Sequence, residues 1–475
     1  MATVGVIGAG IAGLTAAWTL RKRGIDVRVL EASERLGGKI RTEQAEDLLI
    51  DAGPDSFLSS KPPGLALVNE LGLNDQIIST LSNGGGTFIL HDGKLEALPE
   101  GMTLLVPADP RAIMSTPLLS PVGKIRLLGD YVIPRSRKTE DESVAAFMRR
   151  RVGREAFEHL AEPLLSGIFA GDADQLSILA TYPRLRATER EYGGLIRGAM
   201  AMRKTAGGAP TRQFTPFVSL RNGLSQLIDG LADAIGRERI VMETPAREIT
   251  ARNGAYCVTT DAGQQQFDAI ILAIPAPSAS ALLAEIDPEL ASLAGTIPYI
   301  SSTTISLAFN AAEVADQQQG RGFVIPRREG RTLTAVTWTS NKFGGRVPEG
   351  LALLRGFVGR AGDEAPALLP DDELIPIVRR ELADILGITA TPTTVRTYRW
   401  PKAMPQYTVG HLDRLQSMER RLTTHPGLRL TGAAYRGVGI PDCIADAQTQ
   451  ATQIADWLAA ASGEGQPAER PMTSA

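Results

Sequence analysis

The first 31 residues constrain the fold of this chain more than any other stretch. An apolar run ending at Ile7 predicts a short buried strand, and helical periodicity begins at Ile11. Gly24 is typical of a residue that ends a helix in the left-handed conformation. A second β-branched run, residues 27–30, leads to an acidic residue, Glu31. The stretch therefore predicts a strand, a helix, a second strand and an acid in that order.

The turn between the first strand and the helix carries three glycines. Gly8 makes the tight turn, Gly10 lets the backbone approach a pyrophosphate, and Gly13 allows helix and strand to pack closely. The N-terminus of the helix offers unpaired N–H groups and a positive dipole end to phosphates. Glu31 lies 18 residues beyond Gly13, near the spacing at which a carboxylate binds a ribose hydroxyl. A lone GxGxxG pattern is weak evidence, but this ordered set predicts a dinucleotide site.

The residues after Glu31 favour one kind of dinucleotide. A nicotinamide site would usually follow its acid with another crossover helix. Here the glycine pair 37–38 and the cations Lys39 and Arg41 follow at once, and a turn-rich loop comes at 51–57. This pattern resembles the flavin amine oxidase superfamily, whose FAD sites carry E-A-x-x-x-x-G-G-K/R after the first fingerprint. The resemblance implies FAD as the cofactor and a second loop that reaches the flavin ring.

Composition describes a globular protein and argues against several function classes. With 475 residues, 43% hydrophobic and 22% charged, the chain can hold two or three domains. A formal net charge of −3 argues against a nucleic-acid partner. The two cysteines, Cys257 and Cys443, cannot form a disulfide framework, and the four histidines are too scattered for metal-ligand spacing. We therefore expect a reducing compartment and no metal centre.

No targeting or membrane-spanning segment is evident. The N-terminus leads directly into the first strand, without the regions of a signal peptide. The most apolar stretch, 269–286, is interrupted by Pro275 and Pro277 and is short for a span. Basic runs at 135–138 and 149–154 are either solvated helix faces or a surface for an acidic substrate or an anionic membrane. We expect a cytoplasmic protein, and peripheral membrane contact stays open.

The rest of the chain alternates between helical and strand-like patterns. Prolines and helical segments fill 96–215, which indicates a separate helical insertion. Apolar runs at 303–309, 332–338 and 351–358 predict an antiparallel sheet, covered by a helix at 372–386. Elements expected elsewhere are a helix at 64–72, a hairpin opening at 83–86, a helix beginning within 217–227, and strands at 240–249, 255–260 and 267–273.

A second glycine-rich turn lies near the C-terminus. A short strand at 428–431 leads into residues 432–442, and a helix with a packed face follows. Pro441 suits the first helical turn, where its missing N–H costs nothing. One interpretation is an ordinary turn. The other is that backbone N–H groups and the helix dipole approach the pyrimidine end of the flavin and stabilise negative charge on its reduced ring.

Five strings narrow the resemblance, which runs over about residues 3–458. They are ASERLGGKI, GPDSFL, EPLLSGIFAGD, MPQYTVGH and GVGIPDCI. These strings resemble the protoporphyrinogen oxidase family of heme biosynthesis, and its soluble bacterial branch in particular, more than any amine oxidase. Propensity alone would make the third string a helix end followed by a loop.

That branch implies an FAD-dependent, oxygen-using, six-electron oxidation of coproporphyrinogen III to coproporphyrin III, with hydrogen peroxide as co-product. The alternative is oxidation of protoporphyrinogen IX to protoporphyrin IX. More distant alternatives are a flavin amine oxidase or desaturase, for which Trp400, Tyr407 and Tyr435 are the candidate aromatic residues beside the flavin, and a non-catalytic FAD-binding or heme-chaperone module. The implied partners are a porphyrinogen and molecular oxygen. Handover to a ferrochelatase and the oligomeric state stay open.

The resemblance also implies a set of FAD contacts. The segment 244–249 would contact the adenine through the backbone at Ala246. Cys443 does not match the covalent flavin–cysteine motif of monoamine oxidases, so we expect non-covalent FAD. The other implied FAD-binding residues are Gly8, Ala9, Gly10, Ile11, Ala12, Gly13, Glu31, Ala32, Lys39, Gly53, Pro54, Asp55, Ser56, Trp400, Val438, Gly439 and Ile440.

The candidate substrate-binding residues are chosen by their charge. Hydride would pass from a bridge carbon of the porphyrinogen to flavin N5, so no catalytic side chain is named. The four propionates of coproporphyrinogen favour basic residues at the pocket mouth. Lys61, directly after the flavin-side loop, is the first candidate, and an exposed loop lysine is the alternative interpretation. Arg221, Arg436 and Lys402 are weaker candidates.

Together these patterns predict a mixed α/β fold in three parts. A Rossmann-type FAD-binding domain is joined by an antiparallel-sheet substrate-binding domain and the helical insertion domain. The expected bounds are 1–63, 216–280 and 398–461 for the FAD-binding domain, 64–95 and 281–397 for the substrate-binding domain, 96–215 for the insertion, and 462–475 for a disordered tail.

Overall fold

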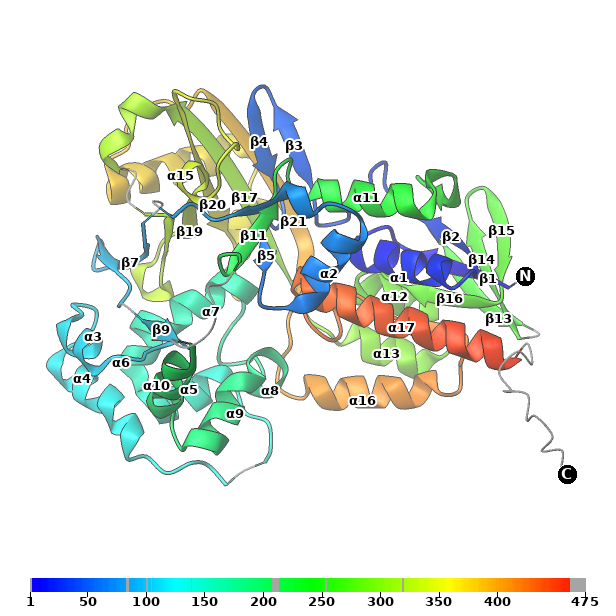
Figure 1. Cartoon of the computed structure of the whole chain (residues 1–475), viewed down its shortest axis with the longest axis horizontal. Coiled ribbons are helices and arrows are strands. Elements are labelled where there is room, and N and C mark those ends of the chain that lie inside the picture. Colours follow the sequence, from blue (N-terminus) through cyan, green and yellow to red (C-terminus); the bar gives the residue numbers. More distant parts are fainter. Residues whose placement is uncertain are drawn as a thin grey trace, which may run out of the picture.

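The mixed α/β fold is confirmed. The computed structural model describes residues 2–82, 85–99, 101–103, 105–137, 139–206, 213–252, 254–317 and 320–461. Figure 1 shows a parallel-sheet unit on the right, a seven-stranded sheet at the upper left and a group of helices at the lower left. The expected disordered tail, 462–475, lies outside the described residues, as do Asn83 and Gly84 at the start of the expected hairpin.

Five parallel strands organise the right-hand unit. In spatial order they are β12 (Ile240–Val241), β2 (Asp26–Leu30), β1 (Thr3–Ile7), β16 (Ala269–Leu272) and β22 (Leu428–Leu430). Val6 in the central strand pairs with Val29 on one side and Ile271 on the other. The strands are short and mostly apolar because both faces of a parallel sheet are covered.

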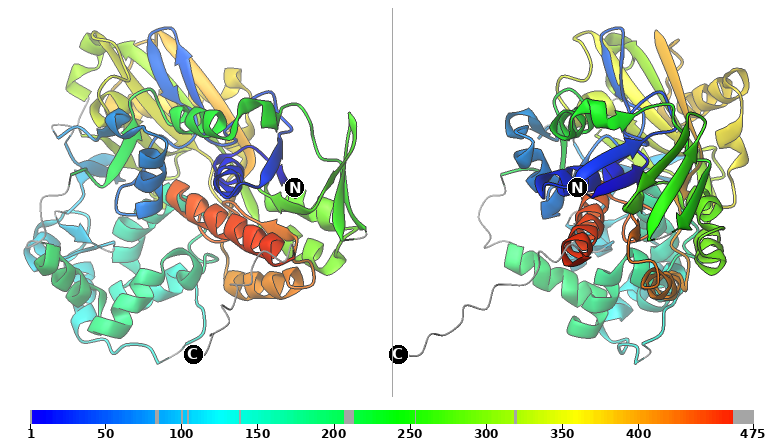
Figure 2. Two further views of the ribbon diagram at one scale, coloured as in Figure 1. Left: turned by 45° about the vertical axis from the view of Figure 1, so that its right-hand side comes forward. Right: turned by 90° about the vertical axis from the view of Figure 1, so that its right-hand side faces the viewer.

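Helices cover one face of this sheet, and a small antiparallel sheet with two helices covers the other (Figure 2). Leu14, Ala17 and Leu20 of α1 are fully buried in the first of these layers. Its helices are α1 (Ile11–Lys22), α11 (Ser225–Ile235) and α17 (Ile440–Ala461). The second layer holds β13 (Glu248–Arg252), β14 (Ala255–Thr260), β15 (Gly263–Phe267), α12 (Ala276–Leu283) and α13 (Pro288–Gly295).

The seven-stranded sheet lies beside the parallel sheet. Its order is β21 (Thr394–Pro405), β17 (Tyr299–Asn310), β20 (Leu351–Val358), β19 (Leu333–Trp338), β18 (Gly322–Val324), β7 (Thr87–His91) and β8 (Lys94–Ala97). Neighbouring strands are antiparallel except β18 and β7, which run parallel. Helix α15 (Asp371–Leu386) packs on one face, and the hairpin of β3 (Thr42–Ala45) and β4 (Leu48–Asp51) packs on the other.

The helical insertion has its own apolar core, which includes Phe147, Met148 and Phe157. Its helices are α3 (Pro110–Ser115), α4 (Pro121–Leu128), η2 (Gly129–Tyr131), α5 (Val144–Val152), α6 (Arg154–Ala156), the π-helical turn Phe157–Ala161, α7 (Glu162–Phe169), α8 (Ile178–Thr181), α9 (Pro183–Tyr192) and α10 (Leu195–Ala206). The short strands β9 (Met102–Thr103) and β10 (Val106–Pro107) lead into it. Helix α7 lies against β18 and β19, so the insertion contacts the seven-stranded sheet directly.

Of three local predictions, two are confirmed and one, the strand at 240–249, was wrong. A helix does begin within 217–227, as α11 at Ser225, and the residues before it form a strand, β11 (Phe217–Leu220), because β5 (Phe57–Leu58) and β6 (Ile77–Ser79) pair with it. The expected strand 240–249 is divided between two sheets, and Glu243 takes a positive φ of 50° where the chain turns. The string EPLLSGIFAGD is a helix end followed by a loop, as propensity predicts: it is helical as far as Phe169, and the loop begins at Ala170, with φ 47°.

Candidate functional site

The glycine turn after β1 is built as a dinucleotide cradle. Gly8 has φ 101°, and a side chain there would meet the Ala273 carbonyl at 2.7 Å. A Cβ on Gly13 would lie 1.9 Å from the Gly8 carbonyl oxygen, so helix and turn touch backbone to backbone. A Cβ on Gly10 would meet nothing within 4 Å. The turn is therefore tight where it packs on the protein and open where a pyrophosphate would approach.

Glu31 is fixed against this turn. Its Oε2 accepts a hydrogen bond from the Ala9 N–H at 2.7 Å, and its Oε1 accepts from the N–H and hydroxyl of Ser33 at 2.9 and 2.7 Å. The Thr244 N–H donates to the Glu31 carbonyl at 2.8 Å. The segment that leads to Ala246 therefore lies beside Glu31, at the end of the site where the resemblance places the adenosine.

Lys39 is a cation without an anionic partner among the described residues. Gly37 donates its N–H to the Ala9 carbonyl at 2.9 Å, which holds the glycine pair against the cradle. The Lys39 Nζ lies 5.8 Å from the centre of the Tyr299 ring, and no hydrogen bond or ion pair reaches it from the part of the chain that the structure describes. Burial lowers the pKa of this ammonium to about 8. A desolvated cation of this kind fits an anionic ligand.

The second loop is held by the seven-stranded sheet. The Ala52 carbonyl accepts hydrogen bonds from Thr304 Oγ1 at 2.8 Å, Arg355 at 2.9 Å and Trp400 Nε1 at 3.3 Å. A Cβ on Gly53 would lie 1.8 Å from the Lys39 carbonyl oxygen, so only glycine lets the two loops meet. The loop at 52–56 thus joins the dinucleotide cradle to the sheet, and Trp400 supports it from β21.

Asp55 connects the loop at 52–56 to the short helix that follows β19 of the seven-stranded sheet. Lys342, on α14 (Thr339–Lys342), donates to both carboxylate oxygens of Asp55 at 2.8 Å, and Ser56 Oγ donates to Oδ1 at 2.7 Å. Burial alone would raise the pKa of the Asp55 carboxyl, but Lys342 and Arg355 outweigh it and hold that pKa well below its usual range. Sequence reasoning missed Lys342 and Arg355, because neither lies in a recognisable motif.

The glycine-rich turn at 432–439, directly before α17, is the C-terminal part of the candidate site. Gly437 has φ 140°, and a side chain there would meet Asp442 at 2.4 Å. Ile440 begins α17, so Val438 and Gly439 lie directly before its N-terminus, as expected. Asp442 in the first turn accepts from Lys61 Nζ at 2.7 and 2.6 Å. Lys61 is therefore ion-paired rather than free, and it precedes α2 (Pro62–Glu70).

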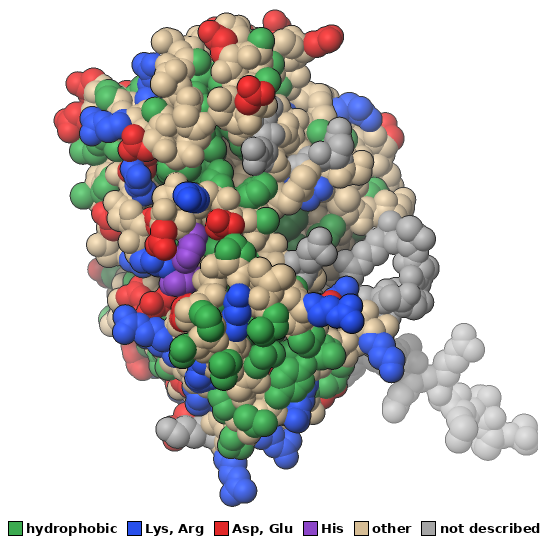
Figure 3. Space-filling view, turned by 90° about the vertical axis from the view of Figure 1, so that its left-hand side faces the viewer, with side chains coloured by type: hydrophobic (Ala, Val, Ile, Leu, Met, Phe, Trp, Pro, Cys, Tyr) green, Lys and Arg blue, Asp and Glu red, His purple; other side chains and the backbone are tan. Residues whose placement is uncertain are grey.

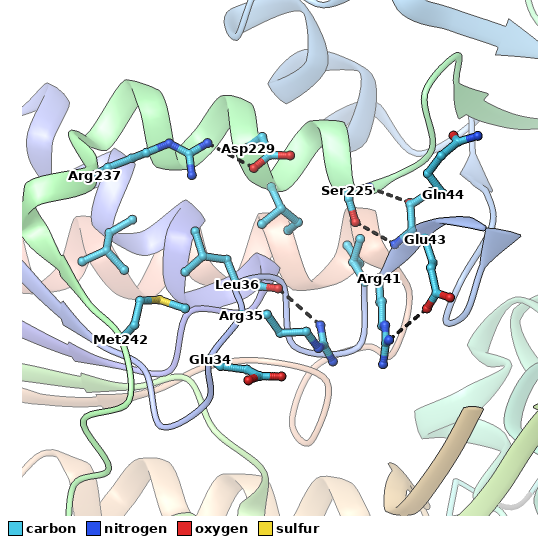
Figure 4. A pocket seen from close by; sticks show the side chains of 14 residues that line it. Glu34, Arg35, Leu36, Arg41, Glu43, Gln44, Ser225, Asp229, Arg237 and Met242 are labelled. Atoms are coloured by element: carbon cyan, nitrogen blue, oxygen red, sulfur yellow. Dashed lines mark hydrogen bonds and ion pairs between the residues drawn. The ribbon is translucent and has the colours of Figure 1, made fainter. Parts of the chain in front are cut away.

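A cleft of about 700 Å³ lies between residues 34–44 and α11 (Figure 4). Arg35 donates to the carbonyls of Leu36 at 3.3 Å and Gly38 at 2.6 Å. Arg41 lies beside it and pairs with Glu43 at 3.0 Å. Burial and the neighbouring Arg41 lower the pKa of the Arg35 guanidinium. Arg35 therefore holds the glycine pair 37–38 in place, whereas Arg41 pairs with β3.

The arrangement fits FAD. The open face at Gly10, the fixed carboxylate of Glu31 and the ammonium of Lys39, which has no partner among the described residues, match a pyrophosphate and a ribose. The loop at 52–56 is held by the seven-stranded sheet, and Val438 packs against the core of the helical insertion. Among the described residues no group of three potential ligands could hold a metal ion. In the same part of the chain, no helix is long and apolar enough to cross a membrane.

Comparison with known proteins gives consistent results. The family described as flavin containing amine oxidoreductase matches residues 11–455. The coproporphyrinogen III oxidase of Bacillus subtilis is 35% identical over 95% of this chain and 98% of its own length. The chloroplastic protoporphyrinogen oxidase 1 of Spinacia oleracea is 30% identical over 95% and 84%. A crystal structure from Exiguobacterium sp. 255-15, 34% identical, superposes with a TM-score of 0.85 and covers 96% of this chain and 99% of that one.

Proposed function

Because this chain belongs to the family of flavin-containing amine oxidoreductases, we propose that it uses FAD to oxidise coproporphyrinogen III to coproporphyrin III. The observation that carries the proposal is the 35% identity to a coproporphyrinogen III oxidase over 95% of the chain. The site supports it independently, since its open cradle and unpaired cation suit FAD. The bound flavin supplies the hydride acceptor, and the protein supplies position and electrostatics.

The proposed reaction removes six hydrogen atoms from the substrate. Each of three turnovers takes a hydride from a bridge carbon of the substrate and releases a proton. Two of the three protons come from pyrrole N–H groups and the third from the remaining bridge carbon, so each of the four bridges loses one hydrogen. Molecular oxygen takes up each electron pair with two protons and leaves as hydrogen peroxide. One coproporphyrinogen and three oxygen molecules thus give one coproporphyrin and three hydrogen peroxide molecules. The product would then pass to a metal-inserting enzyme, a ferrochelatase.

The FAD contacts follow from the cradle. We assign the pyrophosphate to the turn at 8–13 and Lys39, the adenosine end to Glu31, Ala32 and Ala246, and the flavin ring to the loops at 53–56 and 438–440 with Trp400. Gly10 leaves room for the phosphates, and the N–H groups at the start of α1 face the same end of the sheet. The ammonium of Lys39 neutralises phosphate charge there.

The substrate is assigned to the junction of the sheet and the helical insertion. Figure 3 shows a hollow between the upper part of the molecule and the helical part below it. Lys61 stays the candidate for a propionate contact, and a substrate carboxylate would compete with Asp442 for its ammonium. Arg221, Arg436 and Lys402 stay weaker candidates. Arg436 is paired with Asp446 at 2.9 Å, and Lys402 lies 3.4 Å from Glu364.

The direct test compares two substrates on purified, FAD-loaded protein. Coproporphyrinogen III and protoporphyrinogen IX are supplied in air, and porphyrin fluorescence is followed. We expect a higher kcat/KM for the substrate with four propionates, and in the Lys61→Ala variant a loss confined to that substrate.

Two outcomes would change the assignment. A preference for protoporphyrinogen IX would move the protein to the reaction named for its relative from Spinacia oleracea. No fluorescence from either substrate, with flavin bound, would contradict porphyrinogen oxidation and leave an amine oxidase or desaturase as the reading to test.

We also propose peripheral contact with an anionic membrane, through the tip of the helical insertion. Met114, Val122, Ile125 and Val132 are between 57% and 82% exposed, and Figure 3 shows hydrophobic side chains gathered there with Lys and Arg around them. Exposed apolar side chains rimmed by cations suit an anionic lipid surface. The protein would remain in the cytoplasm, which its two free cysteines favour.

The membrane proposal predicts co-sedimentation with vesicles that contain phosphatidylglycerol, and little with phosphatidylcholine alone. The double variant Val122→Asp/Ile125→Asp should lose most of this binding, because it places charge at the contact. Leu368→Asp is the control, since Leu368 is 52% exposed on η8 (Ala365–Leu368), outside the insertion. Equal binding by both variants would contradict this contact.

A further inference from the structure

Residues 406–411 follow β21 and form a strap with two buried rings. Tyr407 and His411 are only 2% and 0% exposed. Their rings stack with centroids 4.0 Å apart and an interplanar angle of 11°. The strap belongs to the string MPQYTVGH, which helped to place the chain in its family but received no role in the cofactor site or the reaction.

One side of the strap holds the glycine-rich turn before α17. The Tyr407 hydroxyl donates to the Ala433 carbonyl at 2.7 Å and accepts from the Gly437 N–H at 2.8 Å. His411 Nε2 donates to the Tyr435 carbonyl at 2.9 Å. A single phenol thus joins the two ends of a five-residue stretch, and the imidazole holds its middle. Only a group that donates and accepts at once can do this.

The other side of the strap holds the helical insertion. Gln406 Nε2 donates to the carbonyl of Phe169, the last residue of α7, at 3.0 Å. The Ser177 N–H donates to the Tyr407 carbonyl at 2.8 Å. The rings of Phe169 and Tyr407 lie 6.3 Å apart. The same few residues therefore contact the substrate-side helix and the cofactor-side turn.

We propose that Tyr407 is a positioning residue for the flavin, which it serves by fixing the turn at 433–437 relative to α7. This proposal rests on the assignment of FAD to the site above. The hydroxyl keeps the start of α17 and the N–H groups before it pointed at the pyrimidine end of the ring. These N–H groups belong to Gly437, Val438 and Gly439. Oriented N–H groups stabilise the negative charge of the reduced flavin and raise its reduction potential.

The strap keeps its protonation state over the working range of pH. Burial raises the pKa of the Tyr407 phenol far above its ordinary value, and burial lowers the pKa of His411 to about 4. The charged groups nearest His411, namely Arg414, Arg436 and Asp141, change this little, because burial is the largest cause. The phenol and the imidazole are therefore neutral hydrogen-bonding groups from about pH 5 to pH 10.

The test is the reduction potential of FAD bound to the Tyr407→Phe variant, measured against a reference dye, together with the dissociation constant of FAD. Phenylalanine keeps the stack on His411 and removes only the hydroxyl. We expect FAD to bind and its two-electron reduction to become about tenfold less favourable, which is a potential about 30 mV more negative. The control is Tyr182→Phe, because the Tyr182 hydroxyl is buried with no hydrogen-bond partner in the part of the chain that the structure describes, and its ring packs on the same Phe169.

Each outcome of this measurement either supports or overturns the proposal. An unchanged potential in FAD-loaded Tyr407→Phe would overturn the proposal, as would an equal shift in Tyr182→Phe. If Tyr407→Phe does not fold, His411→Phe gives the same test, because it removes the donor to Tyr435 and keeps an aromatic ring on Tyr407. A failure of the wild-type protein to bind FAD would instead contradict the cofactor assignment, so the two failures are distinguishable.

Discussion

The positive charge of Lys39 is partly buried, and the described residues provide no anionic partner for it. Such a group costs free energy in the folded protein unless a ligand neutralises it. Its pKa of about 8 lies below the ordinary 10.5. Without FAD, the unfolded chain therefore binds more protons than the folded one between these values, so this residue makes the free energy of unfolding rise with pH in that window.

FAD affinity should respond to pH in the opposite direction. The phosphates favour the charged form of Lys39, so raising the pH above about 8 should weaken FAD binding, by at most about tenfold per pH unit. Titrating FAD into the apoprotein from pH 7 to 9.5 measures this. Lys39→Arg is the matched control, because a guanidinium keeps its charge throughout. Parallel profiles for the two proteins would show that Lys39 does not contact the phosphates.

Among the elements, the helical insertion contains a buried group of charges around Arg151, which includes Asp130 and Glu189. Arg151 at the end of α5 and Asp130 in η2 are both fully buried, and Arg151 Nε donates to Asp130 Oδ1 at 2.7 Å. Arg151 also donates to the Ile133 carbonyl at 2.9 Å and the Gly193 carbonyl at 3.1 Å. One guanidinium thus joins η2, α5 and the end of α9.

Replacing Arg151 with Met should destabilise the protein by about 3–5 kcal/mol, because Asp130 would stay buried without its partner. The control is Arg154→Met, whose side chain is 82% exposed in an i,i+4 pair with Glu158 and should change stability by less than about 1 kcal/mol. Urea unfolding of both variants measures the difference. Asp130→Leu/Arg151→Met should recover part of the loss, and no recovery would mean that packing, not the unpaired charge, is responsible.

The elements that sequence reasoning placed well are those with local causes. The strand, turn and helix at 3–22 follow from apolar pattern and glycine geometry, and α15 and α17 follow from helical periodicity. β11 was missed because its identity comes from strands 140 to 160 residues earlier in the chain, and no periodicity over four residues reveals such partners. The π-helical turn at 157–161 has no sequence signal.

At the scale of the whole molecule, contacts between residues far apart in the sequence also limit what can be predicted of the site. Gly8, Gly10 and Glu31 could be proposed from sequence because they lie within one βαβ unit. The Lys342–Asp55 and Lys61–Asp442 pairs could not, because their members lie 287 and 381 residues apart. Domain bounds stay predictions, and β21 runs across the expected boundary at 397/398 while it pairs with β17 along most of its length.

The parallel sheet has a consequence for how the protein is made. β1, α1 and β2 leave the ribosome well before β22 and α17, which complete the sheet and cover α1 and lie more than 390 residues later in the chain. Until then the nascent chain exposes an open strand edge and the apolar side of α1, a state prone to aggregation. We therefore expect the turn at 8–13 to reach its final surroundings, and FAD to bind, only after α17 has left the ribosome.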